Sequence, residues 1–238
     1  KVIATECRNP VMKIDSHHHF WKYDPIEYSW MNEDMGVLKR DYGPTELKKE
    51  IDEAGIDGVV SVQASQTLAE TDALLDYAAK EDFIKGVVGW FPLAEENVVD
   101  VIAPYVDNRL LKGVRHVVQD EPEDRFILGE DFNRGVTRLK EFGLVYDILI
   151  YERQLAPSIE FVDRHPNLVF VLDHVAKPRI RDNAMKSWAD LMQQMAEQIG
   201  QWLEQPWLIY HLRVMLCQNV IYSKHGLSPF LANNSSLM

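Results

Sequence analysis

The stretch Ile14-Asp15-Ser16-His17-His18-His19-Phe20-Trp21 joins the start of a predicted strand to three consecutive histidines. Side chains alternate along a strand, so His17 and His19 point to one face and His18 points to the other. Asp15 shares the face of His17 and His19. Paired imidazoles at a strand end are typical of a metal or catalytic site. Three histidines in a row also occur in solvated stretches and in tag remnants, so the rest of the sequence decides.

Outward from this stretch, residues 13–179 alternate short β-branched runs with amphipathic segments. This is the pattern of repeated strand–helix units around a parallel sheet. Each predicted strand is nearly all apolar until its last residues, as strands buried on both faces are. The predicted strands are residues 13–17, 58–64, 84–91, 111–118, 144–150 and 168–174. The predicted helices are residues 45–54, 69–81, 95–106, 130–142 and 154–164, the first ending at a left-handed Gly55 cap.

Repeated units with polar strand ends predict an α/β fold of the (β/α)8 barrel type, with its site at the carboxyl ends of the strands. A doubly wound open sheet is the alternative. That fold more often carries a glycine-rich nucleotide turn, and the sequence contains neither GxGxxG nor GxxxxGK[ST]. The polar and aromatic segment 22–43 is long for a loop, which predicts a lid, a binding wall or a disordered stretch.

Composition narrows the class of partner. The chain has 238 residues, 46% of them hydrophobic, which suits one globular domain with a sizeable core. Its net charge of −12 argues against nucleic acid or an anionic membrane and favours a small-molecule ligand. Without a long apolar run or a signal-peptide pattern, we expect a cytoplasmic protein. Cys7 and Cys217 have no metal-binding spacing, and we assign them no chemistry.

Polar and ionisable residues recur at the ends of the predicted strands. Taken singly, Asp147 and Asp173 are explained as caps of the following helices, and His174 as a histidine bonded to backbone. Their convergence at one edge of a barrel favours a shared site. His165, next to Pro166, is interpreted instead as a helix-end histidine facing water. The candidates are Asp15, His17, His19, Gln63, Trp90, Arg115, His116, Asp147, Asp173 and His174.

Several of these residues belong to separated motifs that occur together, in this order, in a known family. By these motifs the chain resembles the amidohydrolase-related lactonases, and within them it is most similar to sugar lactonases that act on L-fucono- and L-rhamnono-lactones. The resemblance covers residues 12–188. The motifs are residues 14–21, quoted above, Tyr23-Asp24-Pro25, Val62-Gln63-Ala64, Gly113-Val114-Arg115-His116, Leu144-Val145-Tyr146-Asp147 and Leu172-Asp173-His174-Val175-Ala176-Lys177-Pro178.

The resemblance implies a TIM barrel of the metal-dependent hydrolase type that opens a sugar-acid lactone to the hydroxy acid. His17, His19 and His174 would form the catalytic cluster and bind a divalent metal such as zinc, or bind the substrate directly if no metal is needed. Neutral imidazole is a common zinc ligand, and bound metal lowers the pKa of water to about 7. The implied substrate-binding residues are Arg115 and His116 for the lactone oxygens, Gln63 and Asp147 for hydroxyls, and Trp30 for stacking on the sugar ring.

The carboxyl-terminal part departs from the family pattern. Members end the last barrel strand in a Ser-Asp-Trp-Pro-like motif whose aspartate activates water, and residues 205–238 contain no Asp or Glu. We therefore expect a truncated or altered carboxyl terminus, with the barrel incomplete or altered in its last two βα units. The expected organisation is an extension at 1–11, a barrel at 12–188 and an atypical tail at 189–238. Activity is expected to be weak or absent.

Two other functions remain open at this point. A related barrel with the same first-strand histidine pair can decarboxylate an unsaturated or aromatic acid through a similar metal site. A partial barrel can also be non-catalytic, binding a sugar acid or forming a homo-oligomer through its apolar tail.

Overall fold

Six parallel strands form one continuous sheet in the computed structural model, which describes residues 12–182 and 185–201. Each strand pairs with the next one along the chain, in the order β1-β2-β3-β4-β5-β6. All six predicted strands are confirmed, most of them ending two or more residues earlier than expected. Their bounds are β1 Ile14–His18, β2 Gly58–Val62, β3 Ile84–Gly89, β4 Leu111–His116, β5 Val145–Ile148 and β6 Phe170–Leu172.

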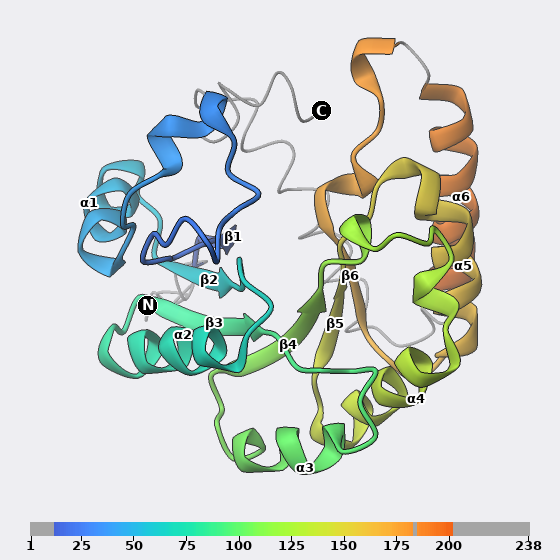
Figure 1. The fold of residues 1–238 in the computed structure, drawn as a ribbon, viewed down its shortest axis with the longest axis horizontal. Coiled ribbons are helices and arrows are strands. Elements are labelled where there is room, and N and C mark those ends of the chain that lie inside the picture. The colour runs from blue at the N-terminus through green and yellow to red at the C-terminus, as the bar shows by residue number, and fades with distance from the viewer. Residues whose placement is uncertain (1–11, 183–184, 202–238) are drawn as a thin grey trace, which may run out of the picture.

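Helices follow the strands and lie along the outer side of a curling sheet, which forms part of a barrel (Figure 1). This arrangement confirms the predicted TIM-barrel type of fold over its first six strands. The predicted alteration of the last two βα units falls mostly on residues outside the described ranges. Two predicted helices are shorter than expected and continue as 3-10 turns, at Ala103–Tyr105 and Leu139–Phe142; in the first, Pro104 lacks an N–H to continue the helix. The helices are α1 Pro44–Ala54, α2 Leu68–Lys80, α3 Val98–Ile102, α4 Glu130–Arg138, α5 Leu155–Arg164 and α6 Met185–Gln201.

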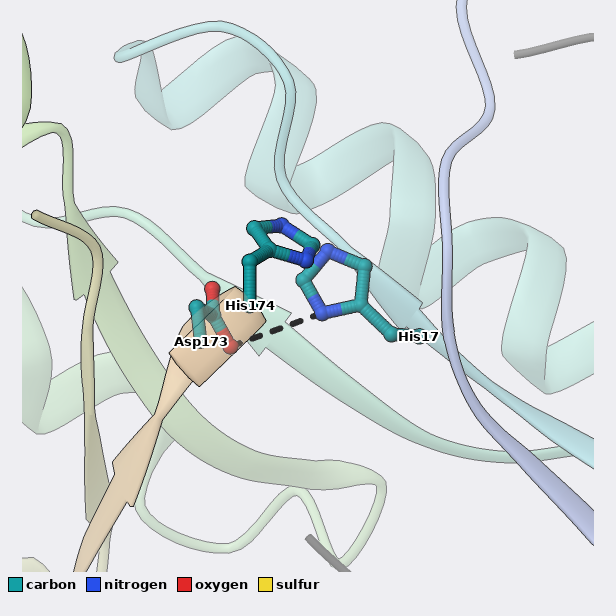
Figure 2. Close-up of side chains that lie close together, drawn as sticks. All are labelled: His17, Asp173 and His174. Carbon is teal, nitrogen blue, oxygen red and sulfur yellow. Dashed lines mark ion pairs between the residues drawn. The ribbon is translucent and has the colours of Figure 1, made fainter. Parts of the chain in front are cut away.

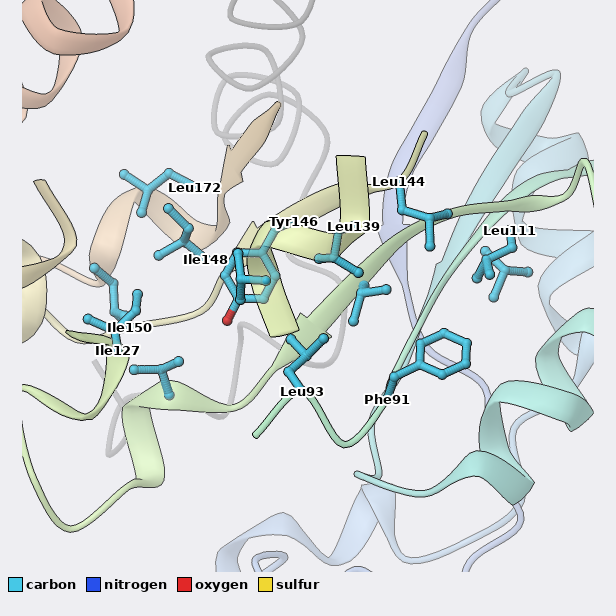
Figure 3. Packing of buried hydrophobic residues seen from close by; sticks show 14 of the residues in the cluster. Phe91, Leu93, Leu111, Ile127, Leu139, Leu144, Tyr146, Ile148, Ile150 and Leu172 are labelled. Carbon is cyan, nitrogen blue, oxygen red and sulfur yellow. The ribbon is translucent and has the colours of Figure 1, made fainter. Parts of the chain in front are cut away.

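The main core lies between the sheet and the helices that cover it (Figure 3). Aromatic rings join the helices to the strands: Phe132 of α4 and Phe161 of α5 both contact Tyr146 of β5, with centroid separations of 6.0 and 5.7 Å. All three residues are at most 2% exposed. Because apolar burial is the main favourable term in folding, this packing fixes the strands whose ends carry the polar residues.

The segment 22–43 is ordered and has a small core of its own. Trp21 and Tyr42 exchange two backbone hydrogen bonds, of 3.1 and 2.9 Å, and Trp21 Nε1 donates to the Arg40 carbonyl at 2.9 Å. A 3-10 helix, Glu33–Leu38, follows within it. The buried cluster consists of Trp21, Tyr28, Met31, Met35 and Leu38. The segment is therefore a packed loop with its own core beside the end of β1, and it is called the wall segment below.

The helix α6 begins before residue 188, the predicted end of the barrel domain, and continues beyond it. Met195 of this helix is 2% exposed and belongs to the main core. The predicted tail from residue 202 and the predicted extension at 1–11 lie outside the described residues. Within the described ranges, none of the helices combines the length and apolarity needed to cross a membrane.

We predict that Gly135→Ala destabilises the fold although alanine is the better helix former. Gly135 lies inside α4, and a Cβ there would overlap with the Leu93 carbonyl group. Overpacking of this kind costs about 1–3 kcal/mol. Urea unfolding of both proteins measures the loss. Gly36→Ala is the matched control, because a Cβ there meets nothing within 4 Å. Equal stability of Gly135→Ala and the parent chain would contradict the packing described.

Candidate active site

The two outer strands of the sheet bring a histidine and an aspartate–histidine pair together. His17 lies on β1, and Asp173 and His174 begin the turn after β6. One ligand atom from each residue lies within 4.8 Å of the others. His17 Nδ1 is 3.5 Å from Asp173 Oδ1, and the rings of His17 and His174 are 4.8 Å apart (Figure 2). Curling of the sheet thus joins residues more than 150 positions apart in sequence.

His19 joins this group through His17, as predicted for residues on one strand face. The two Nε2 atoms are 3.3 Å apart, and His19 Nδ1 is 2.8 Å from the Val62 carbonyl. A carbonyl only accepts, so Nδ1 carries the proton and Nε2 of His19 is left with a lone pair. Burial, together with the charges of His17 and Arg115, keeps the pKa of His19 well below its usual value. His19 is therefore a neutral imidazole.

His18 points away from the cluster, which agrees with the predicted alternation. Its Nε2 is 2.8 Å from Ser61 Oγ on β2, and its ring lies 4.4 Å from that of Phe20. Burial lowers the pKa of His18 to about 3. His18 is a packed, neutral residue behind the strand.

A buried ion pair connects β4 to the turn after β6. Arg115 Nη1 donates to Asp173 Oδ2 at 2.8 Å and lies 3.3 Å from His17 Nε2. The side chains of Arg115 and Asp173 are 4% and 0% exposed. Gln63 is fully buried beside the arginine. Its backbone carbonyl accepts from Arg115 Nη2, and its side-chain Nε2 donates to the backbone carbonyl of Arg115 at 3.2 Å. In this state Gln63 holds Arg115; its predicted contact with a substrate hydroxyl remains a prediction.

Asp147 lies beside the ion pair, because its Cα pairs with that of Arg115 across β4 and β5. Burial, and then the charge of Asp173, raise the pKa of Asp147 well above its usual value. Burial also disfavours ionised Asp173, yet His17 and Arg115 hold the pKa of Asp173 well below its usual range. The opposite shifts place negative charge preferentially on Asp173 and favour the protonated form of Asp147.

The other two predicted substrate-binding residues differ in their surroundings. Both ring nitrogens of His116 already have protein partners: Glu121 Oε1 at 2.6 Å from Nε2, and Trp90 Nε1 at 3.4 Å from Nδ1. Trp30 is 43% exposed and has no hydrogen bond or ring contact with the cluster in the part of the chain that the structure describes. A substrate would have to displace a partner of His116 to bind that ring, and stacking of Trp30 on a sugar ring remains a prediction.

His165 does not face water, and the prediction for it was wrong. It is 8% exposed, with Nε2 2.9 Å from Asn133 Oδ1 and Nδ1 3.3 Å from Thr137 Oγ1. Burial lowers the pKa of His165 to about 4. The ring is neutral because burial disfavours its charged form, and polar side chains of α4 contact both of its nitrogens.

The turn after β6 has a left-handed backbone without any glycine. His174, Val175, Ala176 and Lys177 have φ of 51°, 48°, 60° and 48°. Each such residue costs on the order of 1–2 kcal/mol. The turn closes through a 2.9 Å hydrogen bond from Lys177 N–H to the His174 carbonyl, and Trp188 Nε1 of α6 donates to the Val175 carbonyl at 2.8 Å. Strain of this kind often accompanies functional sites.

Asp173 and Lys177 are site residues to which sequence reasoning gave no specific role. Asp173 was explained as a helix cap, although its position next to His174 was the available signal. Burial and then Arg115 lower the pKa of Lys177 to about 8, whereas Asp120 and Asp173 raise it. At neutral pH Lys177 is therefore mostly a cation near the buried ion pair.

The donor set fits a divalent metal. Two imidazole nitrogens on one tetrahedral zinc lie about 3.4 Å apart, given Zn–N bonds of about 2.0–2.1 Å, and the His17 and His19 Nε2 atoms are 3.3 Å apart. Among the described residues, the buried Asp173 Oδ1 has no hydrogen-bond partner; His17 Nδ1, at 3.5 Å, contacts it as an ion pair. Arg115 already contacts His17 and Asp173, so a metal would share this site with a fixed positive charge.

The end of β2 is positioned by one buried carboxylate. Glu70 Oε2 accepts from the backbone N–H groups of Ala64 and Ser65 at 2.9 and 2.7 Å, and Tyr28 Oη donates to Oε1 at 3.4 Å. Burial raises the pKa of Glu70 to about 7 against these hydrogen bonds. Glu70 thus links the wall segment to the loop that follows Gln63.

The chain belongs to the amidohydrolase family: residues 14–220 match the family model described as amidohydrolase, which extends beyond the motifs found in the sequence. An L-fucono-1,5-lactonase from Burkholderia multivorans is 37% identical over 191 residues, covering 78% of this chain and 64% of that protein. An L-fucono-1,5-lactonase from Burkholderia ambifaria is 30% identical, covering 77% and 63%. The chain therefore spans slightly less than two thirds of the length of these relatives.

A solved structure agrees with the fold. The crystal structure of an amidohydrolase from Burkholderia multivorans with bound zinc has a TM-score of 0.76 and 37% sequence identity to this chain, covering 79% of this chain and 67% of that one. The predicted family is confirmed by these matches.

We predict that Glu70→Gln changes how stability depends on pH. Glu70 in the folded chain has a pKa of about 7, above its ordinary value of 4.5, so between these values the folded state retains a proton that the unfolded state has lost. Stability from this group therefore falls as pH rises. Between about pH 5 and about pH 8, the free energy of unfolding should decrease by on the order of 2 kcal/mol less in the variant than in the parent chain. Urea unfolding measures it; the exposed Glu95→Gln is the control, and parallel profiles would refute the shift.

Proposed function

We propose that this chain binds a sugar-acid lactone at the carboxyl ends of its strands and hydrolyses it to the hydroxy acid. The carrying observation is the cluster of His17, Asp173 and His174 in contact with a buried Arg115. Two relatives, 37% and 30% identical to this chain, are named L-fucono-1,5-lactonases, which supports a sugar lactone as substrate. A small neutral ring with several hydroxyls also suits a site lined by imidazole, carboxyl and guanidinium groups.

The reaction adds water to the lactone carbonyl carbon and breaks the bond to the ring oxygen, which takes a proton; the new acid loses one. In this proposal Arg115 stabilises the negative charge that develops on the carbonyl oxygen. Asp173, ionised and beside His17, orients that imidazole to accept a proton from water. Asp147, whose protonated form is favoured by burial and by the charge of Asp173, is a donor for a substrate hydroxyl or for the leaving oxygen.

A divalent metal, with zinc as the first candidate, would be held by His17, His19 and His174 together with Asp173. When bound, it supplies a Lewis acid that polarises the carbonyl and lowers the pKa of water. Zinc in the related crystal structure supports this assignment. Because Arg115 provides positive charge at the same place, we propose that the site retains part of its substrate affinity when metal is removed.

We further propose that turnover by this chain is slow. In the part of the chain that the structure describes, the carboxyl groups beside Arg115 are those of Asp173 and Asp147. Asp173 is engaged by Arg115 at 2.8 Å, which lowers its basicity. Asp173 itself therefore accepts a proton poorly at neutral pH, which leaves the activation of water to His17.

Hydrolysis of L-fucono-1,5-lactone, followed with a pH indicator, tests the proposed function. We expect lactone opening above the spontaneous rate and a loss of ~100-fold or more in His17→Ala, since general acid–base catalysis contributes about 10²–10⁴-fold. His18→Gln is the matched control, because His18 faces Ser61 and not the cluster. Absence of turnover in the parent chain would overturn the proposal, and release of carbon dioxide from an unsaturated acid would replace it with the decarboxylase alternative.

Metal content gives an independent test. Elemental analysis of the purified chain after zinc loading and dialysis should show bound metal that His17→Ala and His174→Ala both lose. His18→Gln should retain it. Full metal content in the His17→Ala and His174→Ala variants would remove these residues from the ligand set.

A further inference from the structure

Lys177 places a half-buried cation among the loops that follow three neighbouring strands. Its Nζ donates to Gln119 Oε1 at 2.5 Å and lies 5.1 Å from the centre of the Tyr151 ring. Gln119 follows β4, Tyr151 follows β5, and Lys177 itself follows β6. These are the carboxyl ends of the strands, where barrel enzymes bind their substrates.

The charge of Lys177 is not neutralised by an ion pair within the described part of the chain. Its two direct partners are a neutral amide oxygen and an aromatic face. By contrast, Lys48, Lys80 and Lys186 each pair with an aspartate four residues away on the same helix. An ammonium group has three N–H donors, and Gln119 accepts only one of them. Lys177 therefore retains donors for a ligand with negative charge.

The backbone fixes Lys177 relative to the histidine cluster. His174 and Lys177 are the first and last residues of the left-handed turn, which their own 2.9 Å hydrogen bond closes. Trp188 holds the middle of that turn. Gln119 is equally fixed, since its N–H donates to the Leu149 carbonyl at 3.0 Å and its carbonyl accepts from Arg153 at 3.1 Å. A strained turn anchored on both sides presents the amine in one place.

We infer that Lys177 binds the carboxylate of the open hydroxy acid, so that it recognises the charged product more strongly than the neutral lactone. The inference rests on the proposed function, because ring opening is what creates this carboxylate. Arg115 pairs with Asp173, and the proposed function directs its remaining charge to the carbonyl oxygen. Lys177 is then the cation left for the carboxylate, because its ammonium group has no ion pair in the described part of the chain. The amide of Gln119 and the ring of Tyr151 then serve to position the amine.

Binding of L-fuconate and of L-fucitol, the uncharged alcohol with the same hydroxyl pattern, tests this inference by isothermal titration. In the parent chain L-fuconate should bind more tightly than L-fucitol. Lys177→Met should weaken L-fuconate binding by at least ~10-fold, as expected for loss of a charge-assisted hydrogen bond, and leave L-fucitol binding unchanged. Lys80→Met, which removes an exposed lysine, is the control. If Lys177→Met does not fold, Lys177→Gln keeps a donor toward Gln119 without the charge.

Equal L-fuconate affinity in the parent chain and the Lys177 variant would overturn the inference. Equal loss for both ligands would also overturn it, since Lys177 would then only hold the loops together. Lactone hydrolysis by the same samples separates this failure from that of the proposed function. If the chain hydrolyses the lactone but L-fuconate binding is unchanged in the Lys177 variant, only the role of Lys177 is refuted. If the chain shows no turnover and binds neither ligand, the proposed function and the role of Lys177 are both refuted.

Discussion

The buried ion pair between Arg115 and Asp173 is the constraint on which the site depends. Both groups are almost without solvent contact, and an isolated buried charge costs several kcal/mol. Each is therefore stable only in the presence of the other, which fixes β4 relative to the turn after β6. His17 of β1 contacts both members, so the ends of three strands are held in one arrangement by charge.

Around this pair, polar groups occupy one edge of a sheet whose interior is apolar. Gln63, directly after β2, holds the arginine, and Glu70 holds the loop after Gln63 through two backbone N–H groups. Parallel strands make this possible because all their carboxyl ends meet at one edge. The aromatic packing of Tyr146 and its neighbours supports the strands from behind. Catalytic chemistry and fold stability are thus divided between the end and the body of the same strands.

The left-handed turn at residues 174–177 adds a second kind of constraint. Four residues with positive φ, none of them glycine, hold a conformation that they would not adopt alone. Trp188 of α6 and the fixed position of Asp173 select it. The result is that a histidine of the cluster and a lysine with spare donors are held on one rigid piece of backbone.

The sequence by itself determined the order of strands and helices, the Gly55 cap, which has φ of 65°, and the separation of His17 and His19 from His18. These follow from local periodicity and backbone preference, which depend only on residues close together in the sequence. Only the tertiary structure decided which residues are partners. It paired Arg115 with Asp173. It also gave both nitrogens of His116 protein partners, which the sequence did not predict, and it buried His165, which the sequence-based expectation had placed facing water. Periodicity assigns a side chain to a face of its own strand, but the neighbour across that face comes from another part of the chain and depends on how far the sheet curls.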